Sequence, residues 1–481
     1  MNLRSGVMLI TYPDGLGRNL AELREVLRRF FDGAVAGVHV LPFYPSSSDR
    51  GFSPTRYDIV SPEFGDWRDL AELAGSHYLM YDFMINHLSS RSVQFRDFVA
   101  NRDASPYAGM FIRCKDFWPP CRPTPEDLAR IYKRKPRAPS VTVTFADGSS
   151  EEVWCTFGDD QIDLDLRGEV AWRFVEDSLA ALAARGPALV RLDAVAYAAK
   201  KVGGTCFFEE PETWDILARA RDVLAPHGIE VLPEVHEHYG LQLKLAERGY
   251  WVYDFALPML LLHALSTGET RELAHWLRIC PRKQFTTLDT HDGIGVVDVA
   301  DLLSEAQSER VKDLVFSRDA TVQEIHVPGA YQALDIYQLN CTYFSALGED
   351  DDAYLAARAV QVFAPGIPQV YYVGLLAGGN DLALVEHTRH GRDINRHAYT
   401  IEEVAREVER PVVRKLLGLL RFRNEFPAFD GDACEVTESG SSLTITRTAR
   451  GFRAVLVVDM KTHACSIWYT GMDGQGRRLA L

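Results

Sequence analysis

The sequence predicts an α/β fold, a (β/α)8 barrel. Eight short apolar runs recur along the 481 residues, and stretches with helical spacing lie between them. Such runs are typical of parallel strands that are buried on both faces. Acidic residues stand at the ends of three runs, where the carboxyl ends of barrel strands carry groups that meet a substrate. A doubly wound open sheet is the alternative, but no GxGxxG follows the first run, so a dinucleotide-binding sheet has little support.

Each predicted strand has its own apolar run. In order, the runs are Gly6–Tyr12, Gly37–Phe43, Tyr78–Ile85, Ala188–Leu192, Glu230–Val235, Trp251–Ala256, Gln284–Leu288 and Gln369–Val373. Between the first two, Leu20–Phe31 has apolar residues at helical spacing with Glu and Arg on the other face, and Pro211–Leu224 repeats this pattern. Strands that alternate with helices in this way indicate a catalytic barrel over residues 1–88 and 166–428.

A first insertion interrupts the alternation after the third strand. Residues 89–165 contain no βα unit, and Ser140–Cys155 alternates in polarity around Asp147–Gly148, which predicts a hairpin that turns there. Long excursions from a barrel rim usually carry function or cover the site. We therefore expect residues 89–165 to form an insertion domain that covers the site.

A second insertion and a terminal domain complete the predicted organisation. Residues 297–346, after the seventh strand, contain a helix-like piece and Pro328–Gly329. After Phe429 the pattern changes to short alternating runs such as Ser442–Arg447. Alternation of this kind predicts a small antiparallel β domain over residues 429–481.

Composition limits the classes of function. The net charge of −15 argues against a nucleic-acid partner, because phosphate backbones need a basic surface. The first twelve residues make a poor signal peptide, and no apolar run is long enough to cross a membrane. The eight cysteines are scattered without CxxC pairs, as expected for reduced thiols in the cytosol. These features predict a cytoplasmic enzyme without a membrane partner, and they leave the oligomeric state open.

Three carboxylates are the main candidates for chemistry. Asp193, Glu234 and Asp292 each stand at the end of an apolar run. Taken singly, a strand-end Asp is about as readily a helix cap as a catalyst. Gathered at one rim, three carboxylates point to a glycosidic bond, where one attacks, one protonates the leaving group and one supports the cationic transition state. Arg191 precedes Asp193 by two residues, so both side chains leave the strand on the same side, where the guanidinium favours the ionised carboxylate.

Four motifs carry a resemblance to a known family. Asp82-Phe-Met-Ile-Asn-His87, Arg191-Leu-Asp-Ala-Val-Ala-Tyr197, Leu232-Pro-Glu-Val-His236 and Leu288-Asp-Thr-His-Asp-Gly293 resemble the four signature regions of the α-amylase superfamily. More narrowly, the chain resembles the sucrose phosphorylase subfamily over nearly its whole length. The stretches that support the narrower match are Val252–Pro258, Leu261–Gly268, Asp289–Gly295, Pro368–Gly374 and Gly391–His397.

The resemblance implies a role for each matching residue. Asp193 would be the nucleophile, Glu234 the general acid and then base, and Asp292 the transition-state stabiliser. The other substrate-binding residues that it implies are Asp49, Phe52, His87, Phe157, Arg191, Tyr197, His236, His291 and Arg396, together with Asp335, Tyr337 and Gln338 of a mobile acceptor loop. Phe157 also has a plain alternative as a rim-packing aromatic.

The resemblance implies a retaining glycoside phosphorylase, a glycosyltransferase-type enzyme. Retaining enzymes hold the nucleophile and the acid/base roughly 5–5.5 Å apart. Asp193 would attack C1 while Glu234 protonates the leaving oxygen, and inorganic phosphate would then collect the glucosyl group as α-glucose 1-phosphate. Phosphate would be a co-substrate. No organic cofactor is implied, and no dense run of oxygen ligands indicates a metal site.

The acceptor is the open point. Lys133–Arg137 is a basic run in the first insertion, and sucrose phosphorylases tend to have Pro-Arg where this chain has Arg134 and Lys135. A solvated basic loop is the plain interpretation. Because an extra cation suits a second phosphate, we expect Arg134, Lys135, Arg137 and Tyr337 to bind phosphate and favour sucrose 6′-phosphate as donor. Sucrose is next, then glucosylglycerate or glucosylglycerol.

Two other classes compete with a phosphorylase. A hydrolase or transglucosidase of the same superfamily would share the three carboxylates and differ only in the acceptor. A non-catalytic carbohydrate-binding protein would be expected to have lost at least one of them, and all three are present.

Overall fold

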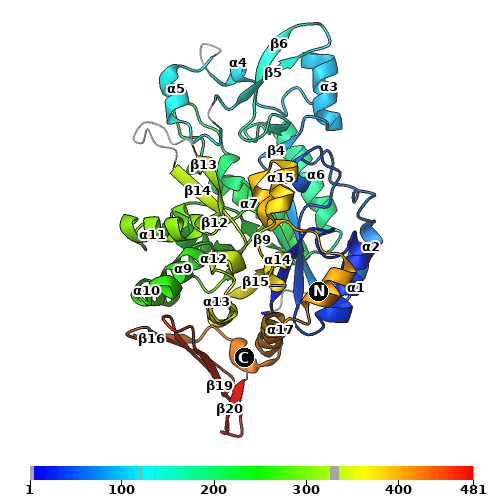
Figure 1. The fold of residues 1–481 in the computed structure, drawn as a ribbon. Coiled ribbons are helices and arrows are strands. Elements are labelled where there is room, and N and C mark those ends of the chain that lie inside the picture. Colours follow the sequence, from blue (N-terminus) through cyan, green and yellow to red (C-terminus); the bar gives the residue numbers. More distant parts are fainter. Residues whose placement is uncertain (1–4, 119–121, 136, 326–334, 480–481) are drawn as a thin grey trace.

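The protein was studied as a computed structural model, which describes residues 5–118, 122–135, 137–325 and 335–479 (Figure 1). The side chains of 322–325 and 335–337 are outside the described part. Among the residues described, no helix has both the length and the apolar character needed to cross a membrane.

Eight parallel strands form the barrel, and each overlaps a predicted run; the last one begins at Ile367, two residues before its run. They are β1 Met8–Thr11, β2 Gly37–Val40, β3 Tyr78–Met84, β8 Leu189–Asp193, β9 Glu230–Pro233, β10 Val252–Asp254, β11 Gln284–Thr286 and β15 Ile367–Tyr371. Their order in the sheet is β10-β11-β15-β1-β2-β3-β8-β9. The two edge strands meet through the Trp251 amide, which donates to the Val231 carbonyl at 3.3 Å. The predicted barrel is confirmed, and the open-sheet alternative is wrong.

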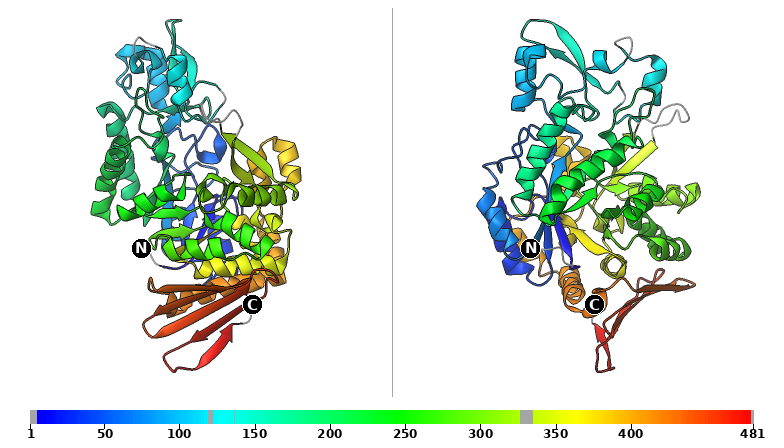
Figure 2. Two further views of the ribbon diagram at one scale, coloured as in Figure 1. Left: turned by 90° about the vertical axis from the view of Figure 1, so that its left-hand side faces the viewer. Right: turned by 180° about the vertical axis from the view of Figure 1, so that it is seen from behind.

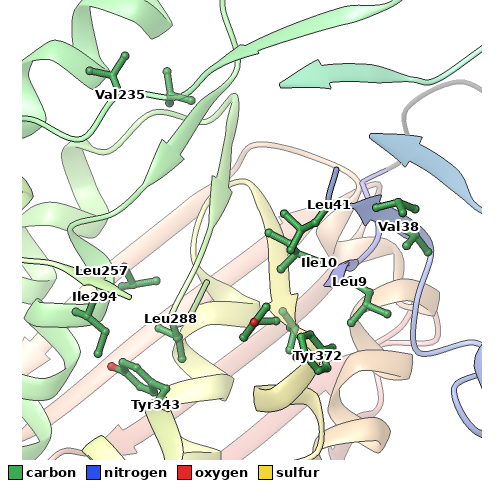
Figure 3. Close-up of a cluster of buried hydrophobic side chains, with 14 of the residues drawn as sticks. Leu9, Ile10, Val38, Leu41, Val235, Leu257, Leu288, Ile294, Tyr343 and Tyr372 are labelled. Carbon is green, nitrogen blue, oxygen red and sulfur yellow. The ribbon is translucent and has the colours of Figure 1, made fainter. Parts of the chain in front are cut away.

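Helices surround the barrel and cover its apolar strands. They include α1 Leu20–Phe30, α2 Trp67–Ala74, α6 Glu169–Ala183, α7 Glu212–Leu224, α8 Tyr239–Glu247, α9 Leu257–Thr267, α10 Arg271–Ile279, α13 Asp351–Phe363, α16 Ile401–Glu407 and α17 Pro411–Glu425. Asn19 caps α1 by accepting from the Glu22 amide at 3.0 Å, and α1 buries Leu20, Leu23, Val26 and Leu27. Figure 3 shows part of this core, in which Leu9 of β1 and Val38 of β2 are fully buried.

The first insertion contains short helices and two small sheets. Its elements are β4 His87–Ser89, α3 Val93–Asn101, α4 Cys114–Phe117, α5 Pro125–Arg130, β5 Ser140–Thr144, β6 Ser150–Trp154 and β7 Gln161–Asp163. Strands β5 and β6 pair as the predicted hairpin, and Gly148 in its turn has a φ of +81°, which suits glycine. Figure 1 places this insertion beyond one end of the barrel.

A buried lysine fastens the insertion to the barrel. The Lys200 ammonium lies 2.8 Å from Asp163 Oδ2 of β7 and 3.0 Å from Asn86 Oδ1, and it also donates to the Tyr197 carbonyl. Asp163 further accepts from the Thr156 amide at 2.8 Å. Because the ammonium and the carboxylate are both buried, removing either alone would leave an unpaired buried charge.

The second insertion adds a three-stranded sheet in the order β12-β14-β13. Its elements are β12 Ile294–Gly295, α11 Glu305–Phe316, β13 Thr321–Ile325, β14 Asp335–Asn340 and α12 Tyr343–Ala346, and the predicted Pro328–Gly329 lies outside the described residues. Farther along the chain, α14 Tyr372–Leu375 and α15 Leu382–Thr388 follow the last barrel strand.

Five antiparallel strands end the chain, as predicted. They are β16 Cys434–Ser439, β17 Ser442–Ala449, β18 Phe452–Asp459, β19 Cys465–Thr470 and β20 Gly476–Leu479. In Figures 1 and 2 this sheet lies at the end of the barrel opposite the first insertion. The domain boundaries chosen from the sequence stay predictions.

Candidate active site

A cavity of about 80 Å³ lies at the carboxyl ends of the barrel strands, and residues of both insertions contribute to its lining. Its lining brings together most residues expected from the sequence, although they come from segments far apart in the chain. The lining residues are Asp49, Phe52, His87, Arg134, Phe157, Gln161, Asp193, Ala194, Ala196, Tyr197, Phe207, Glu234, Val235, His236, His291, Asp292, Gln338 and Arg392.

Arg191 connects the carboxylates at the base of this cavity. Its Nη1 lies 3.0 Å from Asp193 Oδ1, and its Nη2 lies 3.7 Å from Glu234 Oε1. The same guanidinium pairs with Asp82, which also accepts from His39 Nε2 at 2.8 Å. Strand β8 puts Arg191 and Asp193 on one face, as the two-residue spacing predicts. The arrangement holds two carboxylates side by side and orients them.

Burial affects the pKa of Asp193 more strongly than the neighbouring Arg191 does. The pKa of Asp193 is raised well above its ordinary value, first by burial and then by the charges of Glu234, Asp82 and Asp292, although Arg191 opposes the shift. The sequence favoured an ionised Asp193 because of Arg191. The structure adds electrostatic repulsion from three other carboxylates. The two-residue spacing between Arg191 and Asp193 does not reveal it. A proton is therefore retained at this cluster to higher pH than an exposed Asp would retain it.

Glu234 comes directly after β9 and faces Asp193. Its Oε2 accepts from the Ala194 amide at 3.0 Å. Ala194 has a φ of +53°, an unfavourable conformation for a residue with a Cβ, and this turn aims its amide at Glu234. His236 Nε2 lies 3.6 Å from Glu234 Oε1. One oxygen of Glu234 is thus fixed by the Ala194 amide, and the other faces Arg191 and His236.

The surroundings of Asp292 favour its ionised form, in contrast to those of Asp193. Its Oδ2 is 3.2 Å from His291 Nε2, and its Oδ1 is 3.2 Å from Arg392 Nη1. Burial opposes ionisation, but His291, the guanidinium groups of Arg392 and Arg191, and His236 lower the pKa of Asp292 below its usual range. Burial lowers the pKa of His291 to about 3, so this imidazole is neutral near pH 7. Asp292 is therefore ionised where Asp193 tends to keep a proton.

An aromatic wall stands beside Asp292. The Phe52 ring stacks on His291, with centroids 4.9 Å apart and planes 1° apart. His87 Nε2 donates to the Phe52 carbonyl at 2.8 Å, and burial lowers the pKa of His87. Asp49, in the turn before Phe52, has a φ of +51°. Asp160 Oδ2 fastens this turn by accepting from the hydroxyls of Ser47, Ser48 and Ser53 at 2.6, 2.7 and 2.9 Å.

The 3-10 helix Gly391–Asn395 contains Arg392, and Arg396 follows as its C-cap. These two arginines make different contacts. Arg396 donates through Nε and Nη2 to the His291 carbonyl at 3.2 and 3.0 Å, and Arg392 lines the cavity. Arg392 Nη1 also lies 3.8 Å from Asp49 Oδ1. The sequence selected Arg396 and missed Arg392. Both belong to the same motif, but the path of the 3-10 helix decides which one reaches the carboxylates.

The acceptor side is aromatic and carries one arginine of the basic run. Phe157 and Tyr197 meet edge to face, with centroids 5.1 Å apart, and the Arg134 guanidinium lies 5.8 and 5.9 Å from the two ring centres. Burial raises the pKa of Tyr197 to about 12. Lys135 and Arg137 turn to Asp159 instead, and Lys135 Nζ lies 2.8 Å from Cys155 Sγ. Of these three cations, only Arg134 is among the cavity-lining residues.

Gln338 brings the second insertion to the cavity. Its Nε2 lies 3.3 Å from His236 Nε2. Asp335 and Tyr337 belong to the same strand, β14, but their side chains lie outside the described residues. Their predicted contacts with the acceptor stay predictions.

The chain is similar to several known proteins over nearly its whole length. Sucrose phosphorylase of Streptococcus mutans is 52% identical over 445 residues, which cover 92% of each chain. Glucosylglycerol phosphorylase of Marinobacter adhaerens is 42% identical over the full length of both chains. The crystal structure of sucrose 6F-phosphate phosphorylase from Thermoanaerobacter thermosaccharolyticum superposes with a TM-score of 0.97 at 42% identity, over 100% of this chain and 99% of that chain. A scan against family models found no match.

The chain belongs to the sucrose phosphorylase family of glycoside phosphorylases. These enzymes are of the glycosyltransferase type. The resemblance inferred from the four motifs is confirmed, and the non-catalytic alternative loses its basis.

Several cavity residues of this family member gave no signal in the sequence. Gln161 donates to the Phe52 carbonyl at 3.1 Å, and Phe207 packs on Tyr197 with centroids 5.0 Å apart. Gln161 begins the three-residue strand β7, and Phe207 lies in an irregular segment. Neither segment is long enough or regular enough for periodicity or a motif to mark a residue that faces the cavity.

The carboxylate cluster does not fit a metal ion. The side-chain polar atoms of Glu234, His236 and Asp292 approach within 4.8 Å of one another. Arg191 and Arg392, however, already pair with these carboxylates at 3.7 and 3.2 Å. A cation would face two guanidinium groups at short range, which opposes its binding.

Proposed function

We propose that this protein catalyses reversible phosphorolysis of an α-glucoside to α-glucose 1-phosphate, with Asp193 as nucleophile, Glu234 as acid/base and Asp292 as transition-state stabiliser. The observation that carries the proposal is the position of Arg191, which contacts both Asp193 and Glu234 at the base of the cavity. Two carboxylates on one guanidinium lie close enough together for the double displacement of a retaining enzyme.

The first displacement forms a glucosyl ester. The Asp193 carboxylate attacks C1, the bond from C1 to the acceptor oxygen breaks, and Glu234 gives its proton to that oxygen. Ionised Asp292 stabilises the positive charge that develops on the ring. Burial and the neighbouring carboxylates raise the pKa of Asp193, so this cluster retains a proton to higher pH than an exposed Asp would, and the Arg191 guanidinium favours the ionised form of Asp193 that attacks.

The second displacement releases glucose 1-phosphate. A phosphate oxygen attacks C1, the ester bond to Asp193 breaks, and Glu234 takes the proton from phosphate. Retention at C1 follows from the two inversions. The reaction uses inorganic phosphate as co-substrate, and we infer that it needs no resident cofactor and takes place in the cytoplasm.

Sucrose 6′-phosphate is the donor that the acceptor side favours. Arg134 is the cation of the basic run that reaches the cavity, and it lies over the rings of Phe157 and Tyr197. A planar guanidinium binds phosphate oxygens in pairs, so a second phosphate on the leaving group suits this position.

Sucrose itself is the second candidate. The relative from S. mutans, 52% identical to this chain, is named a sucrose phosphorylase. In that case Arg134 would serve inorganic phosphate, which every phosphorylase must bind.

The first experiment tests the reaction class. The protein is incubated with sucrose or sucrose 6′-phosphate, with and without inorganic phosphate, and glucose 1-phosphate and free glucose are measured. We expect α-glucose 1-phosphate that depends on phosphate. Glucose release that is independent of phosphate would identify a hydrolase, and a β-configured product would exclude the ester intermediate.

The second experiment tests the donor. Arg134→Ala is compared with Arg137→Ala, which removes a cation that pairs with Asp159 outside the cavity. Loss of a charge-assisted bond worth about 1.5–3 kcal/mol would lower kcat/KM about 10- to 150-fold. We expect this loss for sucrose 6′-phosphate and a smaller one for sucrose, with Arg137→Ala near wild type. Unchanged kcat/KM for both donors, with a lower kcat/KM for inorganic phosphate, would support sucrose and a role of Arg134 toward inorganic phosphate.

A further inference from the structure

A buried carboxylate lies behind His236 and has no part in the double displacement. Asp298, in the 3-10 helix Val297–Val299, places its Oδ2 3.4 Å from His236 Nδ1. The other ring nitrogen of His236 faces the reaction, 3.6 Å from Glu234 Oε1 and 3.3 Å from the carboxamide of Gln338, whose oxygen accepts from a protonated Nε2 when the amide is turned by 180°. The side chains of His236 and Asp298 are 3% and 2% exposed. His236 therefore bridges a hidden carboxylate and the acid/base.

A glycine in the local backbone allows Asp298 to approach His236 closely. A Cβ at Gly295 would lie 2.1 Å from Asp298 Oδ2 and 3.3 Å from His236 Nδ1, so a glycine is needed where the two groups meet. The His236 ring stacks on Phe255 with centroids 3.8 Å apart, which fixes its plane. Within the described residues, Asp298 Oδ1 accepts no hydrogen bond. A buried carboxylate with so few partners needs a nearby cation.

Carboxylates surround His236 on several elements. Asp298 faces it from the 3-10 helix, Glu234 from its own segment and Asp292 from the segment after β11, while Gln338 and Phe255 are neutral. Burial opposes protonation of the imidazole, but the carboxylates prevail, with Asp298 the strongest, and the pKa of His236 is raised. His291 across the cavity is the opposite case, a neutral imidazole.

We propose that Asp298 is a positioning residue that keeps His236 as an imidazolium, with its Nε2–H turned toward Glu234 and the acceptor position. The proposal rests on the proposed phosphorolysis. The charge on His236 offsets the negative charge of the attacking phosphate near the carboxylates, which would otherwise repel it. Water carries no charge and needs no such compensation, so the pair favours phosphate over water as the acceptor.

The kinetic test compares two Asp–His pairs. Asp298→Asn removes the buried partner of His236. The matched control Asp301→Asn removes an exposed carboxylate that lies 3.1 Å from His238 Nε2. For Asp298→Asn at pH 7.5 we expect kcat/KM for phosphate to fall about tenfold, the equivalent of one pKa unit, and the alkaline limb of its pH profile to move down by about one unit. Glucose release to water should change less than about twofold by the same reasoning, and the control should match wild type.

A second measurement does not depend on activity. The histidine side chains are labelled with ¹⁵N, the His236 signal is assigned from its loss in His236→Asn, and its titration is followed in wild type and Asp298→Asn. We expect a charged ring at pH 7 in wild type and a lower pKa in the variant. A neutral His236 in wild type would overturn the proposal even if Asp298→Asn does not fold.

The two proposals fail in different ways. If wild type forms no glucose 1-phosphate, the proposed function is wrong, and the titration alone then decides whether Asp298 controls His236. If wild type is a phosphorylase but Asp298→Asn loses phosphate and water reactions equally, the positioning role is overturned while the proposed function stands.

Discussion

The donor and acceptor sides of the cavity are built from different parts of the chain. On the donor side, Asp193 ends β8, Glu234 follows β9, and Asp292 follows β11 by six residues. On the acceptor side, Arg134 and Phe157 come from the first insertion and Gln338 from the second. The barrel therefore supplies the groups proposed for chemistry at C1, and the insertions supply most of the groups proposed to contact the acceptor.

This difference explains how one framework serves several donors. Strand ends are held by the barrel ladder on both sides, so their side chains have little freedom. Insertions are free to change length and charge without disturbing the barrel. Two relatives 42% identical to this chain over nearly all of it carry different names, glucosylglycerol phosphorylase and sucrose 6(F)-phosphate phosphorylase.

The largest expected effect is on the donor side. Asp193→Asn should abolish turnover with every donor, and with phosphate and water alike, because the residue that forms the ester is lost. Initial rates and circular dichroism of the purified variant measure this. Near-normal turnover would refute the nucleophile assignment, and loss of only the phosphate reaction would show that Asp193 belongs to the acceptor side.

The next effect separates the two half-reactions. Glu234→Gln should lower kcat/KM for sucrose or its phosphate about 10²- to 10⁴-fold, the usual contribution of general acid catalysis. α-Glucosyl fluoride needs no proton on its leaving group, so its first step should be nearly unaffected. Release of fluoride measures that step. If both donors lose activity equally, Glu234 does not act as the acid.

A smaller effect is expected from a residue of the first insertion that supports the donor side. Asp160 belongs to the insertion, but its carboxylate holds the turn that carries Asp49 and Phe52. Asp160→Asn should raise KM for the donor about tenfold. The reason is that its charge-assisted hydrogen bonds to three serines, taken together, would be weakened by about 1 kcal/mol or more. The neighbouring Asp159→Asn, which contacts Lys135 and Arg137, is the control. An unchanged KM in Asp160→Asn would confine the insertion to the acceptor side.

The smallest expected effect is on stability. The pKa of Asp193 is raised on folding, so its stabilising contribution is complete below about pH 4 and is lost as pH rises through the folded value. Asp193→Asn should therefore raise Tm at neutral pH by about 1–2 °C, with no gain near pH 4. The pKa of Asp292 is lowered, so Asp292→Asn should lower Tm at neutral pH instead. Thermal melts of both variants at several pH values test the opposite signs.

Much of the donor side could be read from the sequence. Eight apolar runs predicted eight strands, and motifs at their ends led to Asp193, Glu234, Asp292 and His87, all of which line the cavity. A strand restricts each side chain to one of two faces, so spacing of two residues was enough to pair Arg191 with Asp193. Arg392 and Gln161 were missed because a five-residue 3-10 helix and a three-residue strand are too short to show such periodicity.

The basic run shows the same limit. Arg134, Lys135 and Arg137 are near neighbours in the sequence, but Arg134 reaches the cavity, and the other two pair with Asp159. Nothing in the order of residues separates them, since the direction of each side chain depends on the path of a loop.

By itself, the sequence determined the barrel, the residues at its strand ends and the family, because periodic burial and short motifs are local properties of the chain. Only the tertiary structure decided which cation of the basic run lines the cavity, which arginine contacts Asp292, and how Asp298 reaches His236. These contacts join residues up to 100 positions apart, such as Arg392 and Asp292 at 3.2 Å, and their strength depends on burial among charges that come from separate elements.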